Sequence, residues 1–234
     1  GGVDHTLFSL GAASGALSFI TAPNFEVMTD GDTDGVYQVT VVVSDDEGLT
    51  DSQLISVTVN DVNEGPEGIT LSNSSMAEEA VGPTVVGVLS STDQDSGDTH
   101  SYTLSDDSGL FEIVDNKLQL NSGAVLDYET ASSYNLNIVS SDDGGLTYSQ
   151  DFTIVLSDVN DRPVITSDSA GATANVSVAE NQTLVTTVLA EDEDAGDGST
   201  GTALSYTVDA SGGVDHTLFS LSTASGVLSF ITAP

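Results

Sequence analysis

Cysteine and tryptophan are absent from the chain, and positive charge is almost absent. Lys117 and Arg162 are the only basic residues among 234, against 37 Asp and Glu, which gives a formal net charge of -35. Internal salt bridges cannot neutralise this charge, so cations from solution must offset part of it. Nucleic acids and anionic lipid surfaces are bound through Lys and Arg, so the composition argues against both as partners.

The lack of cysteine also excludes disulfides and thiolate metal sites. Hard oxygen ligands remain, and they favour calcium, magnesium or manganese over zinc or copper. No apolar run approaches the roughly 18 residues of a membrane span, and no charged-then-apolar leader opens the sequence. We therefore expect an internal piece of a longer exported protein.

The first 23 residues return almost unchanged at the other end of the sequence. "GGVDHTLFSLGAASGALSFITAP" at 1–23 and "GGVDHTLFSLSTASGVLSFITAP" at 212–234 differ at three positions. A near-copy of this kind indicates a piece of a tandem array.

A weaker repeat lies inside this period. Its matched positions are Tyr37 with Tyr134, Asp61 with Asp158, and Glu78 with Glu180. We predict one complete module at 67–163, preceded by the C-terminal half of a module at 1–66 and followed by the N-terminal half of another at 164–234. Neither half-module can close a core alone.

Alternation of apolar and polar residues predicts strands and no helix of note. The alternating segments are 36–44, 53–61, 134–141 and 151–158, and they are rich in β-branched and aromatic residues. Short strands separated by Asp, Gly and Ser turns, in units near 100 residues, indicate an all-β chain of seven-stranded sandwiches.

Acidic phrases recur at fixed places in the modules. Before the second strand stand Glu78 and its counterpart Glu180, and the turn after that strand contains Asp93 and Asp95 in one module and Asp192 and Asp194 in the next. The middle of the module contains Asp127 and Glu129, matched by Asn24 and Glu26, and a late strand ends at Asp142 or Asp45. The modules close with the linkers "DVNEGP" (61–66) and "DVNDRP" (158–163).

This order resembles the cadherin repeat, and more closely the cadherin-like repeats of bacterial surface adhesins. The family pattern is an early Glu, a D-x-D turn, an L-D-x-E segment, an A-x-D-x-G strand end and a D-x-N-D-N-x-P linker. Both linkers here lack the second Asn and are one residue shorter, and Asn24 replaces an Asp. The resemblance implies tandem Ig-like or cadherin-like seven-stranded Greek-key sandwiches.

The resemblance also implies calcium ions between consecutive modules. The second junction would use Glu78, Asp127, Glu129, Asp158, Asn160, Asp161, Asp192 and Asp194. The first junction would use Glu26, Asn24, Asp61, Asn63, Glu64, Asp93, Asp95 and Asp142. Asp45 would serve a junction upstream.

One further acidic loop, "DGDTDG" at 30–35, starts like an EF-hand calcium loop. Alternate Asp30, Asp32 and Asp34 could wrap an ion, but the twelfth position is Val41 instead of Glu, and strands flank the loop. An additional calcium site and an ordinary acidic hairpin turn are both open.

Catalysis is not indicated. No G-x-S-x-G turn accompanies His5, His100 or His216, and acidic residues repeated on every module indicate architecture instead of a single acid-base site.

We expect a calcium-binding, rod-forming segment of a bacterial extracellular adhesin or surface filament, located at the cell surface. The alternative is a recognition module, homophilic or carbohydrate-binding, which could assemble head to tail by complementation of the half-modules. Its partners would then be an identical chain or a cell-surface target.

Overall fold

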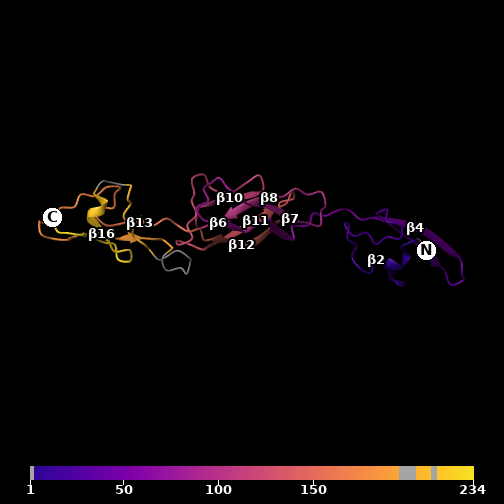
Figure 1. Ribbon diagram of the computed structural model, residues 1–234. Coiled ribbons are helices and arrows are strands. Elements are labelled where there is room, and N and C mark those ends of the chain that lie inside the picture. The colour runs from indigo at the N-terminus through magenta and orange to yellow at the C-terminus, as the bar shows by residue number, and fades with distance from the viewer. Residues whose placement is uncertain (1–2, 195–203, 212–214) are drawn as a thin grey trace. The chain divides into compact units, whose positions relative to one another are not determined.

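The computed structural model describes residues 3–194, 204–211 and 215–234, and its regular structure consists almost entirely of strands (Figure 1). Two short 3-10 helices, His5–Leu7 and His216–Leu218, occupy equivalent positions of the terminal near-copies. Within the described ranges, no helix has the length and apolar character needed to cross a membrane.

The central sandwich, residues 67–158, consists of two four-stranded sheets. One sheet has the order β5-β7-β10-β9 and the other β6-β12-β11-β8. The bounds are β5 Gly68–Leu71, β6 Ser75–Ala77, β7 Val85–Thr92, β8 Ser101–Ser105, β9 Phe111–Val114, β10 Lys117–Leu120, β11 Ser133–Ser141 and β12 Thr147–Ser157.

The first strand of this sandwich is shared between its sheets. Its first part, β5, pairs antiparallel with β7, and its second part, β6, pairs parallel with β12. Counted as one strand, β5 and β6 give the seven-stranded arrangement expected from the sequence. The chain changes sheet between β7 and β8, between β8 and β9 and between β10 and β11, which gives the Greek-key order.

The core of the central sandwich follows the alternation of its strands. In β11 the residues Leu136, Ile138 and Ser140 are buried at every second position, as period-two strands require. Other buried members are Ile69, Val86, Leu89, Phe111, Leu118, Leu120, Leu126, Ile154 and Leu156.

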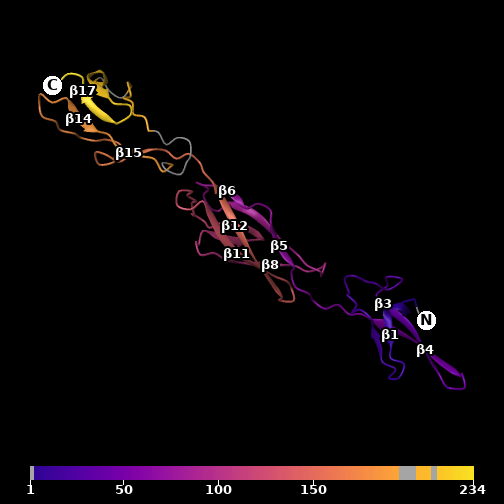
Figure 2. The ribbon, with the colours of Figure 1, turned by 90° about the horizontal axis from the view of Figure 1, so that it is seen from below.

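The N-terminal segment, residues 3–66, contains two antiparallel hairpins, β1 (Phe8–Leu10) with β2 (Leu17–Phe19) and β3 (Val36–Ser44) with β4 (Thr50–Thr58) (Figure 2). Phe8 stacks on Phe19 at a centroid distance of 4.5 Å, and Phe19 meets the ring of Tyr37 edge to face at 5.2 Å. Phe8, Tyr37 and Val39 are the buried residues of this small core.

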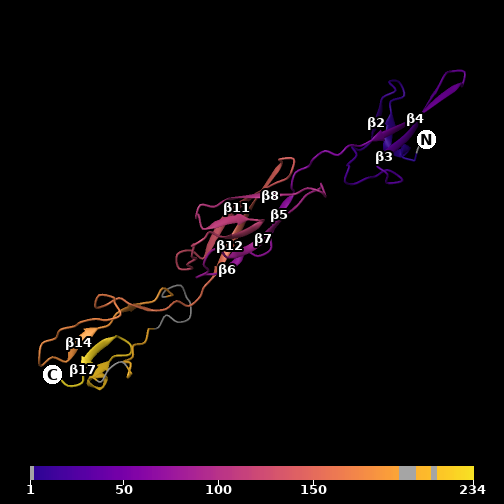
Figure 3. The ribbon, with the colours of Figure 1, turned by 90° about the horizontal axis from the view of Figure 1, so that it is seen from above.

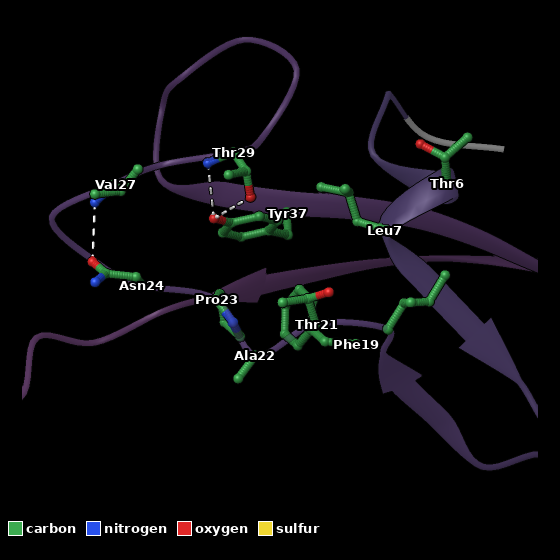
Figure 4. A pocket seen from close by; sticks show the side chains of 11 residues that line it. Thr6, Leu7, Phe19, Thr21, Ala22, Pro23, Asn24, Val27, Thr29 and Tyr37 are labelled. Atoms are coloured by element: carbon green, nitrogen blue, oxygen red, sulfur yellow. Dashed lines mark hydrogen bonds between the residues drawn. The ribbon is translucent and has the colours of Figure 1, made fainter.

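A pocket of about 400 Å³ opens beside this core. Figure 4 shows Tyr37, Leu7 and Phe19 among its lining residues. The hydroxyl of Tyr37 accepts a hydrogen bond from the N–H of Thr29 at 3.3 Å (Figure 4), which ties the ring to the loop before β3.

The C-terminal segment, residues 164–234, contains β13 (Val164–Ile165) paired with β15 (Ala190–Glu191), and a three-stranded sheet of β14 (Leu184–Thr187), β17 (Val227–Phe230) and β16 (Phe219–Leu221) (Figure 3). Phe219 stacks on Phe230 at 4.8 Å, as Phe8 does on Phe19. The near-identical sequences therefore adopt the same hairpin.

The predicted strands are present, with some changes at their ends. β3 spans 36–44 as predicted, but β4 begins at Thr50 and ends at Thr58, not at 53 and 61. β4 starts earlier than predicted because the hydrogen-bonded pairing with β3 continues as far as Ser44 and Thr50. The residues at this end of β4 are polar, so they do not show the apolar–polar alternation on which the prediction rested. β12 likewise begins at Thr147, four residues before the predicted start.

The chain divides into two compact units, residues 1–71, 89–104 and 138–150 in one, and residues 72–88, 105–137 and 151–234 in the other. The first unit contains the linker at 61–66 with the acidic turns that follow it, and the second contains the linker at 158–163. The module boundaries 66/67 and 163/164 stay a prediction.

Candidate metal centres

Glu78, Asp127 and Glu129 form the first acidic group of the second unit. One carboxylate oxygen of each lies within 4.8 Å of the others. Glu78 follows β6, whereas Asp127 and Glu129 lie in the loop before β11, and the N–H of Glu79 donates to the carbonyl of Leu126 at 2.9 Å. This backbone contact brings the early Glu to the mid-module acids.

Glu78 is 4% exposed and holds two backbone segments. Its Oε1 accepts the N–H of Val159 at 2.6 Å, and its Oε2 accepts the N–H of Tyr128 at 2.7 Å. The side chain therefore fixes the linker against the acidic loop.

Asp127 and Glu129 have opposite electrostatic environments. The N–H and hydroxyl of Thr130 both donate to Asp127 at 2.8 Å, and these hydrogen bonds lower its pKa. Both oxygens of Glu129 are buried and accept no hydrogen bond from the described residues. Loss of hydration, with the negative charges of Glu78 and Asp161, raises the pKa of Glu129 to about 7.

Glu129 also belongs to a second group, with Asp158 and Asp194, whose oxygens lie within 4.8 Å of one another. The N–H of Asp161 donates to Asp194 Oδ2 at 2.7 Å, which joins the linker to the acidic turn after β15. Burial, followed by the charge of Glu193, raises the pKa of Asp161. One carboxylate thus contributes to two adjoining oxygen clusters.

The first unit contains a corresponding group formed by Glu26, Asp61, Glu64 and Asp95. The N–H of Glu64 donates to Asp95 Oδ2 at 2.8 Å, as Asp161 does to Asp194. Glu64 Oε2 is buried without a hydrogen bond from the described chain, and burial and the charges of Glu26 and Asp95 raise the pKa of Glu64.

A second group of this unit consists of Asp93, Asp98 and Asp142. The amide of Asn63 donates to Asp142 Oδ2 at 2.9 Å. Burial alone would raise the pKa of Asp142, but hydrogen bonds from Asn63 and from backbone N–H groups lower it. His100 Nε2 lies 3.0 Å from Asp93 Oδ2.

Asp98 was not among the residues predicted from the sequence. It lies in the same "STDQDSGD" turn as Asp93 and Asp95. The third Asp of this turn is the feature of the sequence that could have indicated it. Its Oδ2 is buried and accepts no hydrogen bond from the described residues. The equivalent position in the next turn, 197, lies outside the described residues.

Five predicted ligands occupy supporting positions. Asn24 accepts the N–H groups of Glu26 and Val27, Asp45 accepts those of Glu47 and Leu49 in the β3–β4 turn, and Asp192 accepts that of Asp194. Asn63 and Asn160 donate to the carbonyls of the residues that follow them. Their direct contact with metal stays a prediction.

Asp30, Asp32 and Asp34 form a separate group in the loop before β3. Loss of hydration and the neighbouring charge of Asp34 raise the pKa of Asp32.

The donor sets fit a calcium ion. Calcium takes six to eight oxygens in flexible geometry, and each junction offers two groups of three or four carboxylates. Buried carboxylate oxygens without hydrogen bonds, as in Glu129 and Glu64, are costly unless a cation or a proton occupies them.

Residues 72–157 match the family model of the cadherin domain. Protocadherin gamma-A2 of Homo sapiens is 30% identical over 204 residues, which cover 84% of this chain and 21% of the relative, and the chimpanzee protein of the same name matches equally. The chain thus spans about a fifth of the length of these relatives.

Solved structures support the same fold. Protocadherin Gamma B2 extracellular cadherin domains 1-5 match with a TM-score of 0.66 and 26% identity, over all of this chain and 45% of that one. Mouse Cadherin-23 EC22-24 matches with a TM-score of 0.66 and 23% identity, over 97% of this chain and 72% of that one. The all-β fold of tandem cadherin-like sandwiches is therefore confirmed.

Proposed function

We propose that this chain is a non-enzymatic, calcium-binding segment of an extracellular adhesin or cell-surface filament. The observation that supports it most directly is that each linker, at 61–64 and at 158–161, lies in a carboxylate group with acids from the loops next to it. Ions bound there would fix the linkers and turn a flexible chain into a stiff spacer.

The charge balance supports this role. Carboxylates gathered within 4.8 Å of one another repel when no cation is present, and the chain has two basic residues to offset 37 acids. Without metal, the linkers would be pushed away from the acidic loops. With metal, the same oxygens would hold them.

The comparisons support an extracellular location, since the relatives are protocadherins and the similar structure of Protocadherin Gamma B2 is of extracellular cadherin domains. These relatives come from animals. The bacterial source expected from the sequence gains no support from them and stays a prediction.

Small-angle scattering with and without calcium tests the spacer function. In excess calcium we expect a narrow distribution of interatomic distances, and in chelator a broader distribution with the scattering of a flexible chain. Magnesium at the same concentration is the control, because its strict six-coordinate geometry and reluctant dehydration suit these clusters poorly. Identical curves in calcium and chelator would contradict the proposal.

Strand complementation between copies is a second candidate, favoured by a difference between the two near-copies. β17 pairs with β16 on one edge and with β14 on the other, and the N–H of Phe230 donates to the carbonyl of Thr183 at 2.7 Å. The equivalent strand β2 pairs only with β1 among the described strands. Its other edge therefore suits a strand with the sequence of β14, which a second copy of the chain can supply.

Cysteine trapping tests this pairing, because the chain contains no cysteine of its own. Leu184 is opposite Ser229, whose equivalent in the near-copy is Ser18. A mixture of Ser18→Cys and Leu184→Cys chains should form a disulfide-linked heterodimer, since directly opposed residues lie within bridging distance. Ser44→Cys replaces Ser18→Cys in the control mixture. Equal heterodimer yields in the two mixtures would exclude the pairing.

A further inference from the structure

The loop at 29–36 is folded around the carboxylate of Asp30. Its Oδ2 accepts the N–H of Asp34 at 2.7 Å and that of Gly35 at 3.1 Å. The positive φ values of Thr33 (55°) and Gly35 (78°) let the chain turn around this side chain. One oxygen of Asp30 thus closes the loop.

The other oxygen of Asp30 has no partner. The residue is 4% exposed, and its Oδ1 is buried without a hydrogen bond from the described residues. One carboxylate oxygen each of Asp30, Asp32 and Asp34 lies within 4.8 Å of the other two. A buried anionic oxygen beside two further carboxylates is unfavourable unless a cation binds it.

A fourth carboxylate holds the loop to the rest of the N-terminal segment. Asp4 is 1% exposed; its Oδ1 accepts the N–H of Gly31 at 2.6 Å, and its Oδ2 accepts the N–H of Gln38 in β3 at 2.8 Å. Residues 1–66 contain no Lys or Arg that could neutralise these four acids. The loop is therefore fixed in place with its charge uncompensated by the chain.

We propose that Asp30, Asp32 and Asp34 bind one calcium ion inside the N-terminal segment, separate from the junction groups. The three carboxylates supply alternate ligands, as in the first half of an EF-hand loop, and backbone carbonyls and water complete the oxygen shell. The ion cross-links the loop that Asp4 attaches to β3, so it stabilises the segment itself and not a linker.

The site is weaker than an EF-hand, because its twelfth position is Val41 of β3 and supplies no bidentate carboxylate. We expect a dissociation constant on the order of 10⁻⁴ to 10⁻³ M, the range of extracellular calcium modules. Such a site is half occupied or more at about 1 mM calcium and is filled at about 10 mM.

The test counts calcium ions bound by the full chain, by equilibrium dialysis, in Asp32→Asn and Asp30→Asn. Asp32 is exposed, so its variant leaves the fold intact, whereas Asp30→Asn keeps an acceptor for the two N–H groups. Each variant should bind one ion fewer than the parent chain. Asp46→Asn, an exposed acid of the β3–β4 turn, is the matched control and should lose none.

A second readout locates the ion. The amide resonances of Gly31 and Gly35 should shift during the calcium titration of the parent chain and stay fixed in Asp32→Asn. The proposal is overturned if Asp32→Asn binds as many ions as the parent chain, or if these two amides shift equally in both. If Asp30→Asn fails to fold, the number of calcium ions bound by Asp32→Asn alone tests the proposal. Loss of one ion from Asp32→Asn supports the loop site whatever the outcome at the junctions.

Discussion

At pH 8, replacing Glu129 by Gln should raise the melting temperature of the chain in chelator and remove most of the stabilisation that calcium gives at the second junction. Glu129 is the carboxylate shared by both acidic groups there, and both its oxygens lack hydrogen bonds within the described chain. Glutamine keeps the shape and removes the charge. Without calcium this relieves repulsion from Glu78 and Asp161, and with calcium it removes a ligand of two sites.

The size of the calcium effect follows from linkage. An ion present at about one hundred times its dissociation constant stabilises the folded state by roughly 2.7 kcal/mol. For a sandwich of about 90 residues that corresponds to a rise in melting temperature of roughly 10–20 °C per ion. We expect the variant to lose a rise of this order in a calcium titration followed by circular dichroism.

The pH dependence has a defined sign. The pKa of Glu129 is raised from 4.5 to about 7, so between these values the folded chain holds a proton that the unfolded chain has released. In chelator, its contribution to stability is complete below pH 4.5 and is lost as the pH rises through about 7. The melting temperature of the parent chain, relative to that of Glu129→Gln, should fall across this window.

Calcium should reverse this trend, because the ion needs the ionised carboxylate and displaces its proton. Glu47→Gln, in the exposed β3–β4 turn, is the control and should change neither the melting temperature in chelator nor the calcium increment. A Glu129→Gln variant that is less stable than the parent in chelator at pH 8, or that keeps the full calcium increment, would show that Glu129 is not a shared ligand.

The strands and the acidic groups were predictable because their signals are local or repeated. Alternation in 36–44 predicted β3 to the residue, and the recurrent linkers predicted that Asp61 and Asp158 lie near acids from the adjoining loops. Position within a repeat is a property of the sequence. The family order named the residues of the junction groups apart from Asp98, and their role as metal ligands stays a prediction.

The sequence did not predict which of these carboxylates accept backbone hydrogen bonds and which accept none. Glu78 uses both oxygens on backbone N–H groups, whereas Glu129 uses neither, although both are single acids in short motifs. Asn24 accepts the N–H groups of Glu26 and Val27, a role that its place in the repeat did not predict. These roles depend on which backbone donors fold against each side chain, and that information is three-dimensional.

Replacing Gly82 by Ala should destabilise the central sandwich and, through it, the second junction. A Cβ at Gly82 would overlap the backbone carbonyl of Asn121, and a backbone group cannot turn aside as a flexible side chain can. Overpacking of this kind costs about 1–3 kcal/mol. We expect a loss near the upper end, with a melting temperature lower by roughly 10–20 °C in chelator.

The effect on calcium follows from the contacts of the same segment. The N–H of Gly82 donates to the carbonyl of Ala124 and the N–H of Glu79 donates to the carbonyl of Leu126, both at 2.9 Å. These two hydrogen bonds hold residues 78–82 against residues 124–126, which directly precede Asp127. Displacing this segment moves Glu78 away from Asp127 and Glu129. Calcium affinity should therefore fall at the second junction, while the groups around Glu64 and Asp142 keep theirs.

Gly97→Ala is the matched control, because a Cβ at Gly97 meets no atom within 4 Å. It should leave stability and calcium affinity unchanged. If Gly82→Ala lowered the melting temperature but left the affinity of every site intact, Glu78 would be positioned by β6 and its own hydrogen bonds to Tyr128 and Val159 alone. Loss of both together would show that the backbone contact between residues 78–82 and 121–126 builds the metal centre.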